Sequence, residues 1–287
     1  MFGLFCLSIM KGSKIAVIGG GFSGLSTACY LAKAGFEVHV FEQHTVTGGR
    51  GRYYSENGFT FDMGPSWYWM PDVFERFFND FNRSLSSYYE LIRLDPGYRV
   101  FFENDHLDVA ADLKLLYERF DAIEPGSSTR LKAFLKEAQY KYEVGVGNLV
   151  YKPGLRLSEL IDGALFKGLF KLDVFKSLSA HVRKLFKDPR LIQLLEFPVL
   201  FLGAKPQKTP ALYSLMNYAD LVLGTWYPNG GMLKIGTSMT ALAQELGVQV
   251  HTQSAVKRIR IQNNRVTGIE DRKSTRLNSS HVKRSRM

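Results

Sequence analysis

Three glycines near the start of the chain have the spacing of a phosphate-binding turn. Gly19, Gly21 and Gly24 form the pattern Gly-x-Gly-x-x-Gly directly after the apolar run 14–18. The first glycine allows a tight turn, the second lets a pyrophosphate approach the backbone, and the third lets a helix pack closely on a strand. Free N–H groups at the start of that helix carry partial positive charge, which attracts the anion. The spacing therefore predicts a site for the diphosphate of a dinucleotide.

Glu42 adds a predicted contact to ribose. It ends the second apolar run, 37–41, about 20 residues beyond the glycines. A carboxylate in this place accepts hydrogen bonds from both ribose hydroxyls, which favours an unphosphorylated ribose. The glycine pattern alone is weak evidence, but a strand before it, a helix after it and an acid at this distance supply the required context. The alternative is a glycine turn that binds no ligand.

A strand–helix–strand unit is expected to position these residues. Strands are predicted over 14–18 and 37–41, and a helix over 23–34 has its apolar residues on one stripe. Gly35 is a common type of residue at the end of a helix. A parallel pair of strands with a crossover helix is the building block of doubly wound α/β folds.

A second glycine-rich loop separates FAD from other dinucleotides. Gly48, Gly49 and Arg50 follow the second strand, so the chain can fold over a cofactor and offer a guanidinium to phosphate or flavin. Together with the run Asp62-Met63-Gly64-Pro65, this order resembles the flavoprotein superfamily of amine oxidases, protoporphyrinogen oxidases and carotenoid desaturases. The resemblance implies FAD as the cofactor.

Several further segments resemble the bacterial phytoene desaturase family. Tyr53 stands where amine oxidases usually carry Ser or Thr. The segments that carry the resemblance are 48–53, 61–68, 70–74, 210–216 and 226–232. The likeness covers residues 14–270. It implies an FAD-dependent, membrane-associated oxidoreductase that removes a hydride and a proton from a saturated C–C bond of an acyclic carotenoid such as phytoene.

The resemblance also implies which residues hold FAD. These are Gly19, Gly21, Gly24, Glu42, Gly48, Gly49, Arg50, Pro65, Ser66 and Val256. Pro65 and Ser66 are expected near the flavin ring, and Val256 is expected to contact adenine through its backbone or to be an ordinary buried strand residue. No catalytic side chain is predicted, because the six histidines are scattered and no cluster has metal-ligand spacing.

Two stretches could serve a lipophilic polyene substrate. Trp67, Tyr68 and Trp69 offer large apolar faces next to the expected flavin, or they form part of a core. Residues 164–187 hold six basic side chains and one acid among Leu and Phe. That composition suits a helix lying on an anionic membrane, and almost equally a solvated helix face over a core. Because the carotenoid substrate that the resemblance implies is insoluble in water and has to be collected from lipid, peripheral attachment to the inner face of the cell membrane, in the cytoplasm, is expected.

The remaining pattern predicts a second, mostly helical domain. Helices are predicted over 71–81, 111–120, 128–144, 157–170, 174–187 and 189–195, and a strand pair over 91–102 that turns at Pro96-Gly97. A hairpin is predicted at Asn57-Gly58, and strands over 249–251, 256–261 and 266–269. The expected fold is α/β: a doubly wound, glutathione-reductase-type FAD domain (14–90 and 230–270) and a substrate domain (91–229).

Charge and the two ends of the chain complete the sequence-based picture. The formal net charge of +10 divides evenly, because residues 271–287 contribute +5 and residues 1–270 the rest. The sequence has no run of interleaved basic and aromatic residues of the kind that is typical of nucleic-acid binding.

Residues 1–13 are interpreted as an extension and 271–287 as a basic tail foreign to the fold. The chain is therefore expected to be an incomplete fragment with an incomplete FAD domain and little activity of its own.

Two other functions remain open from the sequence. One is a different flavin oxidase of the amine oxidase superfamily, against which Tyr53 and the aromatic stretch argue. The other is a non-enzymatic prenyl-binding escort protein on the same fold, like the Rab GDP-dissociation inhibitors. Such a protein should lack stoichiometric flavin, whereas the intact glycines with Gly49 and Arg50 favour flavin.

Overall fold

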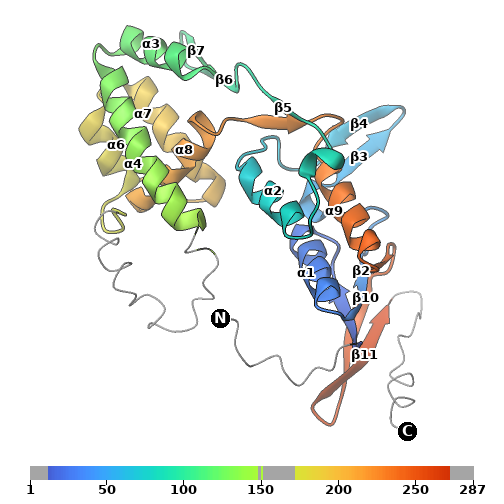
Figure 1. Ribbon diagram of the computed structural model, residues 1–287. Helices are drawn as coiled ribbons and strands as arrows, with labels where there is room; N and C mark the ends of the chain where they lie inside the picture. The colour runs from blue at the N-terminus through green and yellow to red at the C-terminus, as the bar shows by residue number, and fades with distance from the viewer. Residues whose placement is uncertain (1–11, 148–149, 151–171, 272–287) are drawn as a thin grey trace. The chain divides into compact units, whose positions relative to one another are not determined.

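The chain folds into two compact units. The computed structural model describes residues 12–147, 150 and 172–271 (Figure 1). Met1–Ser66, Val73–Leu91 and Tyr227–Met287 make up the first unit, here called the sheet unit. Trp67–Asp72 and Ile92–Trp226 make up the second, here called the helical unit. The predicted α/β fold with a mostly helical second part is confirmed, and the role of the helical unit in substrate binding stays a prediction.

A parallel sheet organises the sheet unit. Strands β1 (Lys14–Ile18), β2 (Glu37–Phe41) and β9 (Gln249–His251) pair in the order β1-β2-β9, with both pairings parallel. Helix α1 (Phe22–Lys33) connects β1 to β2, and α9 (Leu233–Glu245) leads into β9 and packs against α1 (Figure 1). The two helices bury Leu25, Cys29 and Leu242, and α1 packs against β2 whereas α9 packs against β9. The predicted strand–helix–strand unit is therefore confirmed.

Two hairpins extend the sheet unit. Strands β3 (Tyr53–Glu56) and β4 (Phe59–Asp62) turn at Asn57-Gly58, where both residues have positive φ. Strands β10 (Val256–Gln262) and β11 (Arg265–Asp271) turn at Asn263-Asn264, again with positive φ. Asn and Gly tolerate this left-handed conformation, as a tight two-residue turn requires. Short 3₁₀ turns at Gly49–Gly51 and Leu85–Ser87 complete the unit.

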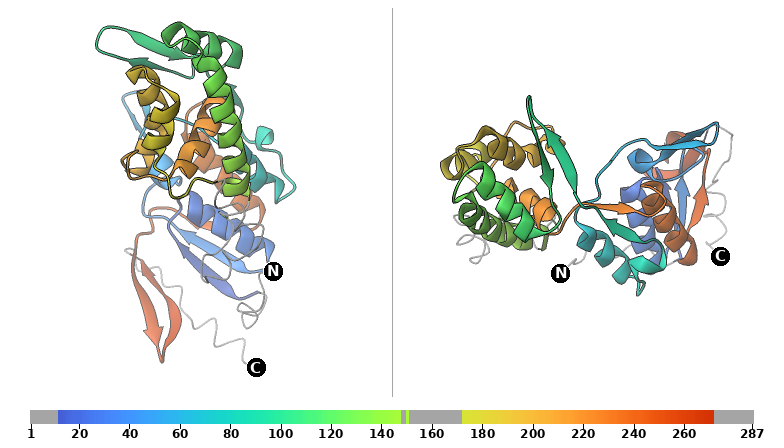
Figure 2. Two further views of the ribbon diagram at one scale, coloured as in Figure 1. Left: turned by 90° about the vertical axis from the view of Figure 1, so that its left-hand side faces the viewer. Right: turned by 90° about the horizontal axis from the view of Figure 1, so that it is seen from above.

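Within the described part of the helical unit, five helices surround the core. They are α3 (Leu113–Ile123), α4 (Ser127–Gly147), α6 (Leu178–Leu185), α7 (Pro189–Glu196) and α8 (Leu215–Leu221). The green α3–α4 pair and the yellow α6–α7 pair lie together in both views of Figure 2. Their apolar stripes bury Leu116, Phe120, Leu131, Phe134, Val182, Phe186, Leu191 and Leu195. The 3₁₀ segments Phe197–Leu202 and Ala211–Ser214 connect the later helices.

Side-chain caps set where several of these helices begin. Asp112 accepts from the backbone N–H of Lys114 and Leu115, and Asp188 accepts from that of Arg190. Ser177 accepts from Ala180, so α6 begins at Leu178 and not at residue 174 as predicted. The predicted helix over 71–81 ends at Asn79 (α2, Pro71–Asn79), and the one over 157–170 lies outside the described residues.

The prediction that the two halves of 91–102 pair with each other is wrong. Strand β5 (Leu91–Arg93) pairs with β8 (Trp226–Pro228), whereas β6 (Tyr98–Phe101) pairs with β7 (His106–Val109). Pro96 has no N–H to give to a ladder between the two halves. A hydrogen bond from the Phe102 N–H to the Asp105 carbonyl, 2.8 Å long, closes a turn that folds β7 back onto β6 instead.

No helix among the described residues is long and apolar enough to cross a membrane.

His181 is a buried histidine surrounded by charge. Its side chain is 8% exposed, its Nδ1 lies 3.0 Å from Lys176 Nζ, and its Nε2 lies 3.4 Å from Glu137 Oε2. Burial, followed by the ammonium groups of Lys141 and Lys176, lowers the pKa of His181 to about 4. The ring is therefore neutral in the native protein at pH values where it is already protonated in the unfolded chain.

We expect the free energy of unfolding to decrease as the pH falls from about 6.5 to about 4, because only the unfolded chain takes up the proton there. Below about 4 the native ring is protonated too, and this contribution levels off. His181→Asn should flatten the dependence in urea unfolding measured across this range. The matched change at the exposed His106, His106→Asn, should leave it intact. Equal slopes for the wild type and His181→Asn would contradict the assignment.

Candidate nucleotide-binding site

The first glycine turn joins β1 to α1. Gly19 has φ +101° and donates its N–H to the Phe41 carbonyl at 2.8 Å. Helix α1 begins where the Leu25 N–H bonds to the Gly21 carbonyl at 2.9 Å. The N–H groups of the first turn thus remain directed at the space before the helix, as an anion site requires.

Backbone crowding explains the glycine spacing. A β carbon on Gly24 would lie 2.0 Å from the carbonyl oxygen of Gly19, which no side chain tolerates. A β carbon on Gly49 would lie 3.0 Å from the α carbon of Gly21. The two glycine loops therefore approach each other through backbone alone.

Two further glycines pack against the second loop. A β carbon on Gly64 would lie 2.1 Å from the Arg50 carbonyl oxygen, and one on Gly236 would lie 2.7 Å from the α carbon of Gly48. The Gly48 N–H donates to the Gly20 carbonyl at 2.8 Å. Gly236 was not predicted. Its signal was a single glycine inside the stretch 232–243, which indicates close approach of another backbone.

These loops line a cavity of about 800 Å³. The residues around it are Ile18, Gly19, Gly21, Phe22, Ser23, Gly24, Gly48, Gly49, Arg50, Gly51, Gly64 and Pro65. Seven of the predicted site residues therefore come together. Ser66 is exposed and Val256 opens strand β10, and neither lines this cavity.

Glu42 holds the glycine turn from behind. Its side chain is buried, Oε2 accepts from the Gly20 N–H at 2.8 Å, and Oε1 accepts from the His44 N–H at 2.8 Å. Each carboxylate oxygen has a second lone pair for a ribose hydroxyl. The carboxylate thus both braces the loop and keeps acceptor capacity.

Arg50 offers positive charge at the cavity. It is exposed, and within the described ranges no carboxylate forms an ion pair with its guanidinium. A glycine-walled cradle beside a helix N-terminus, an acid for ribose and a cation for phosphate fit a dinucleotide. The residues present are therefore compatible with FAD.

Asp62 connects two of the motifs that carried the resemblance. Its Oδ2 accepts from the Tyr227 hydroxyl at 2.6 Å, and its Oδ1 accepts from the Met232 N–H at 3.0 Å. The hydrogen bond from its hydroxyl to Asp62, followed by burial, raises the pKa of Tyr227 to about 12. Residues 61–65 are thereby tied to 227–232, a role for Asp62 that the sequence analysis missed although both motifs were identified.

The helical unit contains a separate aromatic pocket of about 520 Å³. Its walls include Trp67, Tyr98, Val100, Phe101, Phe197 and Leu200. Trp67 contacts the rings of Trp69, Tyr98, Phe197 and Phe201 at centroid distances of 4.9 to 6.1 Å. Of the three predicted substrate residues, Trp67 lines the pocket and Trp69 stacks on the Trp67 ring. Tyr68 is buried, with 2% of its surface exposed, and its backbone forms a β-bridge with Trp226.

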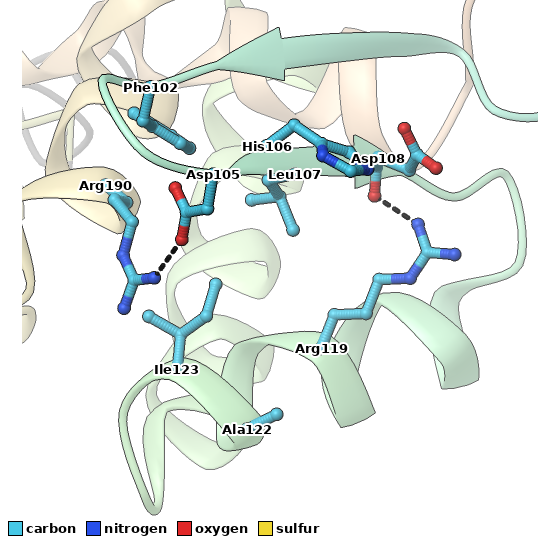
Figure 3. Close-up of a pocket in the computed structure, with 9 residues that line it drawn as sticks. All are labelled: Phe102, Asp105, His106, Leu107, Asp108, Arg119, Ala122, Ile123 and Arg190. Carbon is cyan, nitrogen blue, oxygen red and sulfur yellow. Dashed lines mark hydrogen bonds and ion pairs between the residues drawn. The ribbon is translucent and has the colours of Figure 1, made fainter.

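Two other polar clusters in the helical unit are internally neutralised. Glu137, Asp173 and His181 are close enough to hold a metal ion, but Lys141 donates to Asp173 and Lys176 to His181. Figure 3 shows a pocket in which Arg190 is directed at Asp105 and Arg119 at the Asp108 carbonyl. The ammonium groups of Lys141 and Lys176 stand where a cation would have to bind in the first cluster, and Arg190 and Arg119 have protein partners in the second.

Comparison with known proteins identifies a family and its relatives. Residues 22–277 match the profile of a family described as flavin containing amine oxidoreductase. The chain is 39% identical to a carotenoid 3,4-desaturase of Haloarcula japonica, covering 88% of this chain and 52% of that protein. It is 34% identical to a zeta-carotene-forming phytoene desaturase of Myxococcus xanthus, covering 90% and 50%. The chain spans about half the length of the curated relatives it matches.

Solved structures show the same fold at low sequence identity. An oxidoreductase of Methanosarcina mazei superposes with a TM-score of 0.59 at 21% identity, over 92% of this chain and 57% of that one. A Rab GDI of Plasmodium falciparum superposes with a TM-score of 0.57 at 14% identity, over 93% and 64%. A putrescine oxidase variant gives 0.57 at 16% identity, over 93% and 56%. The predicted resemblance is thus confirmed by sequence and by fold.

Gly24→Ala should push the glycine turn away from α1, because its β carbon collides with the Gly19 carbonyl. We expect a loss of about 3 kcal/mol or more in unfolding free energy. Urea unfolding checks this. Gly147→Ala is the matched control, since nothing lies within 4 Å of its β carbon. Equal stability of the two variants would refute the packing argument.

Glu42→Gln should place an NH₂ group against the N–H of Gly20 or His44. One of these buried donors then loses its acceptor, which costs about 1–3 kcal/mol. We expect lower stability and roughly tenfold or weaker binding of added FAD, measured by fluorescence quenching of the flavin. Gln43→Ala, at an exposed neighbouring position, should bind like the wild type.

Proposed function

Because the chain belongs to the flavin containing amine oxidoreductase family, we propose that it is the FAD-binding portion of an enzyme that desaturates an acyclic carotenoid such as phytoene. The observation that carries the proposal is the aromatic pocket of the helical unit, which is walled by flat apolar rings. The names of the relatives, which are a carotenoid 3,4-desaturase and a phytoene desaturase, support the substrate class.

FAD is the cofactor, and the glycine-lined cavity is where this chain would hold it. Gly19, Gly21 and Gly24 would admit the diphosphate, Glu42 the ribose, and Arg50 would supply positive charge. FAD, when bound, supplies the two-electron acceptor for a hydride from carbon. Pro65 lines the same cavity, whereas contacts of Ser66 with flavin and of Val256 with adenine remain proposals.

The aromatic pocket suits a long conjugated hydrocarbon. Flat rings such as Trp67 and Phe197 bind an apolar chain by exclusion of water and by ring contacts. The charged lining residues Arg99 and Glu196 are paired with Asp108 and Arg183, so they present little net charge to a ligand. The protein's part in the reaction is then to bind, orient and dehydrate the chain, and the allylic hydrogens lower the demand for a strong base.

The two alternatives are less well supported by these features. An amine oxidase binds a cationic substrate, and no unpaired carboxylate lines the pocket among the residues the structure describes. The likeness to a Rab GDI extends to the fold alone. An escort protein has no use for a phosphate-binding loop with Arg50 exposed beside it.

Peripheral membrane association belongs to the same proposal, because a carotenoid has to be collected from lipid. Lys176, Arg183, Lys184 and Lys187 lie in or beside α6, and Phe175 is 89% exposed. A mixture of basic and exposed aromatic side chains suits an anionic membrane surface on the cytoplasmic side. The part of the predicted basic helix before residue 172 lies outside the described residues.

The proposal is tested on the purified chain loaded with FAD and freed of excess. Flavin absorption near stoichiometry is expected, and quenching of tryptophan emission by a carotenoid supplied in detergent micelles should reveal binding in the helical unit. Trp67→Ala should reduce carotenoid affinity about tenfold or more while flavin content is unchanged.

Trp226→Phe is the matched control, since Trp226 does not line the pocket. Stoichiometric flavin without any carotenoid binding would favour another flavin oxidase. Carotenoid binding without flavin, in this chain and in a longer gene product, would favour an escort protein.

A further inference from the structure

A buried carboxyl group lies beneath the aromatic pocket. Asp220, near the end of α8, is 3% exposed and has no charged partner among the described residues. Burial raises its pKa to about 7, against the opposing effect of two hydrogen bonds. A carboxyl kept in such a place at a cost in free energy calls for an explanation beyond packing.

Asp220 anchors two rings that flank Trp67. The Tyr98 hydroxyl donates to Asp220 Oδ2 at 2.5 Å. The Thr225 hydroxyl donates to Asp220 Oδ1 at 3.2 Å, and Thr225 Oγ1 accepts from the indole N–H of Trp69 at 2.8 Å. The carboxyl is therefore the common end of two hydrogen-bond branches that start on aromatic side chains.

Both anchored rings contact Trp67, which lines the pocket. Trp69 is stacked on Trp67 with 6.1 Å between centroids and 12° between planes. Tyr98 meets Trp67 at 5.9 Å and 60°, and itself lines the pocket. Each hydrogen bond fixes the polar end of its ring and so narrows the range of its side-chain torsions.

The other charged groups near α8 have their own partners. Lys141 of α4 bonds to Asp173, and Glu196 pairs with Arg183. Arg93 of β5 donates to the carbonyls of Ala111 and Val222. Only the hydroxyls of Tyr98 and Thr225 hydrogen-bond to the Asp220 carboxyl within the described residues.

We propose that Asp220 is a positioning residue for the aromatic pocket: it holds Tyr98 directly and Trp69 through Thr225, and so fixes a wall shaped for a flat conjugated chain. The preference for such a chain over a flexible saturated one rests on the proposed function, whereas the anchoring does not. An ionised Asp220 accepts from both hydroxyls. When Asp220 is protonated, one of its oxygens carries a hydrogen and faces a hydroxyl that also donates. Acidification therefore weakens one of the two hydrogen bonds that hold the rings.

Tryptophan emission tests the anchoring without any ligand. The chain has three tryptophans, at 67, 69 and 226, and two of them belong to this ring cluster. In the full chain with FAD, we expect an emission change with a midpoint near pH 7, which Asp220→Asn abolishes. Thr225→Val removes one donor that favours the carboxylate, so its midpoint should move upward.

Trp226→Phe is the control and should keep the transition. Asp220→Asn removes a buried charge, so it is expected to fold. A wild-type emission that is constant between pH 6 and 8, or a transition that survives in Asp220→Asn, would overturn the proposal.

Ligand selectivity supplies the second test. Asp220→Ala removes both anchors without adding volume to this buried place, and we expect roughly tenfold weaker binding of a conjugated carotenoid in micelles, as two hydrogen bonds are lost. Binding of a saturated hydrocarbon of equal length should change less. Equal loss for both ligands, or none, would contradict a positioning role. If the wild type shows the pH transition but binds no carotenoid, the proposed function fails and the anchoring stands.

Discussion

Contact between backbones, with no side chain in between, is the constraint on which the sheet unit depends. Gly24 lies against the Gly19 carbonyl, Gly64 against that of Arg50, and Gly236 against the α carbon of Gly48. Each contact joins segments that a single β carbon would force apart. Together they bring β1, the second glycine loop, the end of the β3–β4 hairpin and α9 to one place, and the cavity is what remains between their backbones. Glu42 then supplies a buried carboxylate behind this turn.

The sequence predicted this region well because its signals are local and steric. Gly19, Gly21 and Gly24 have a spacing with one physical explanation, and Asn57-Gly58 has the φ preference of a hairpin turn. Gly236 and the partners of Asp62 escaped prediction because they depend on contacts across more than 150 residues. No pattern within one helix or loop reveals which distant backbone it will meet.

The helical unit was harder to predict for a related reason. Its helices were recognised from apolar periodicity, but β5 and β6 were wrongly predicted to pair with each other, because strand partners depend on turn closure at Asp105 and on the missing N–H of Pro96. Helices α8 and α9 were missed, since α8 is only seven residues long and Gly236 and three Ser or Thr residues dilute the helical pattern of α9. Asp220 gave no signal, as a single acid in an apolar stretch looks the same whether it is exposed or buried.

The sheet order β1-β2-β9 leaves β1 with a partner on one side only among the described residues. No strand within 12–147 or 172–271 pairs with the outer edge of β1, and Ile18 at its end is 49% exposed. Ile259, Ile261 and Val266 expose further apolar surface on the β10–β11 hairpin. Strand edges of this kind act as templates for strands of neighbouring molecules. In concentrated solution, strands of different molecules therefore compete to pair at these edges, and this association lowers the yield of monomer.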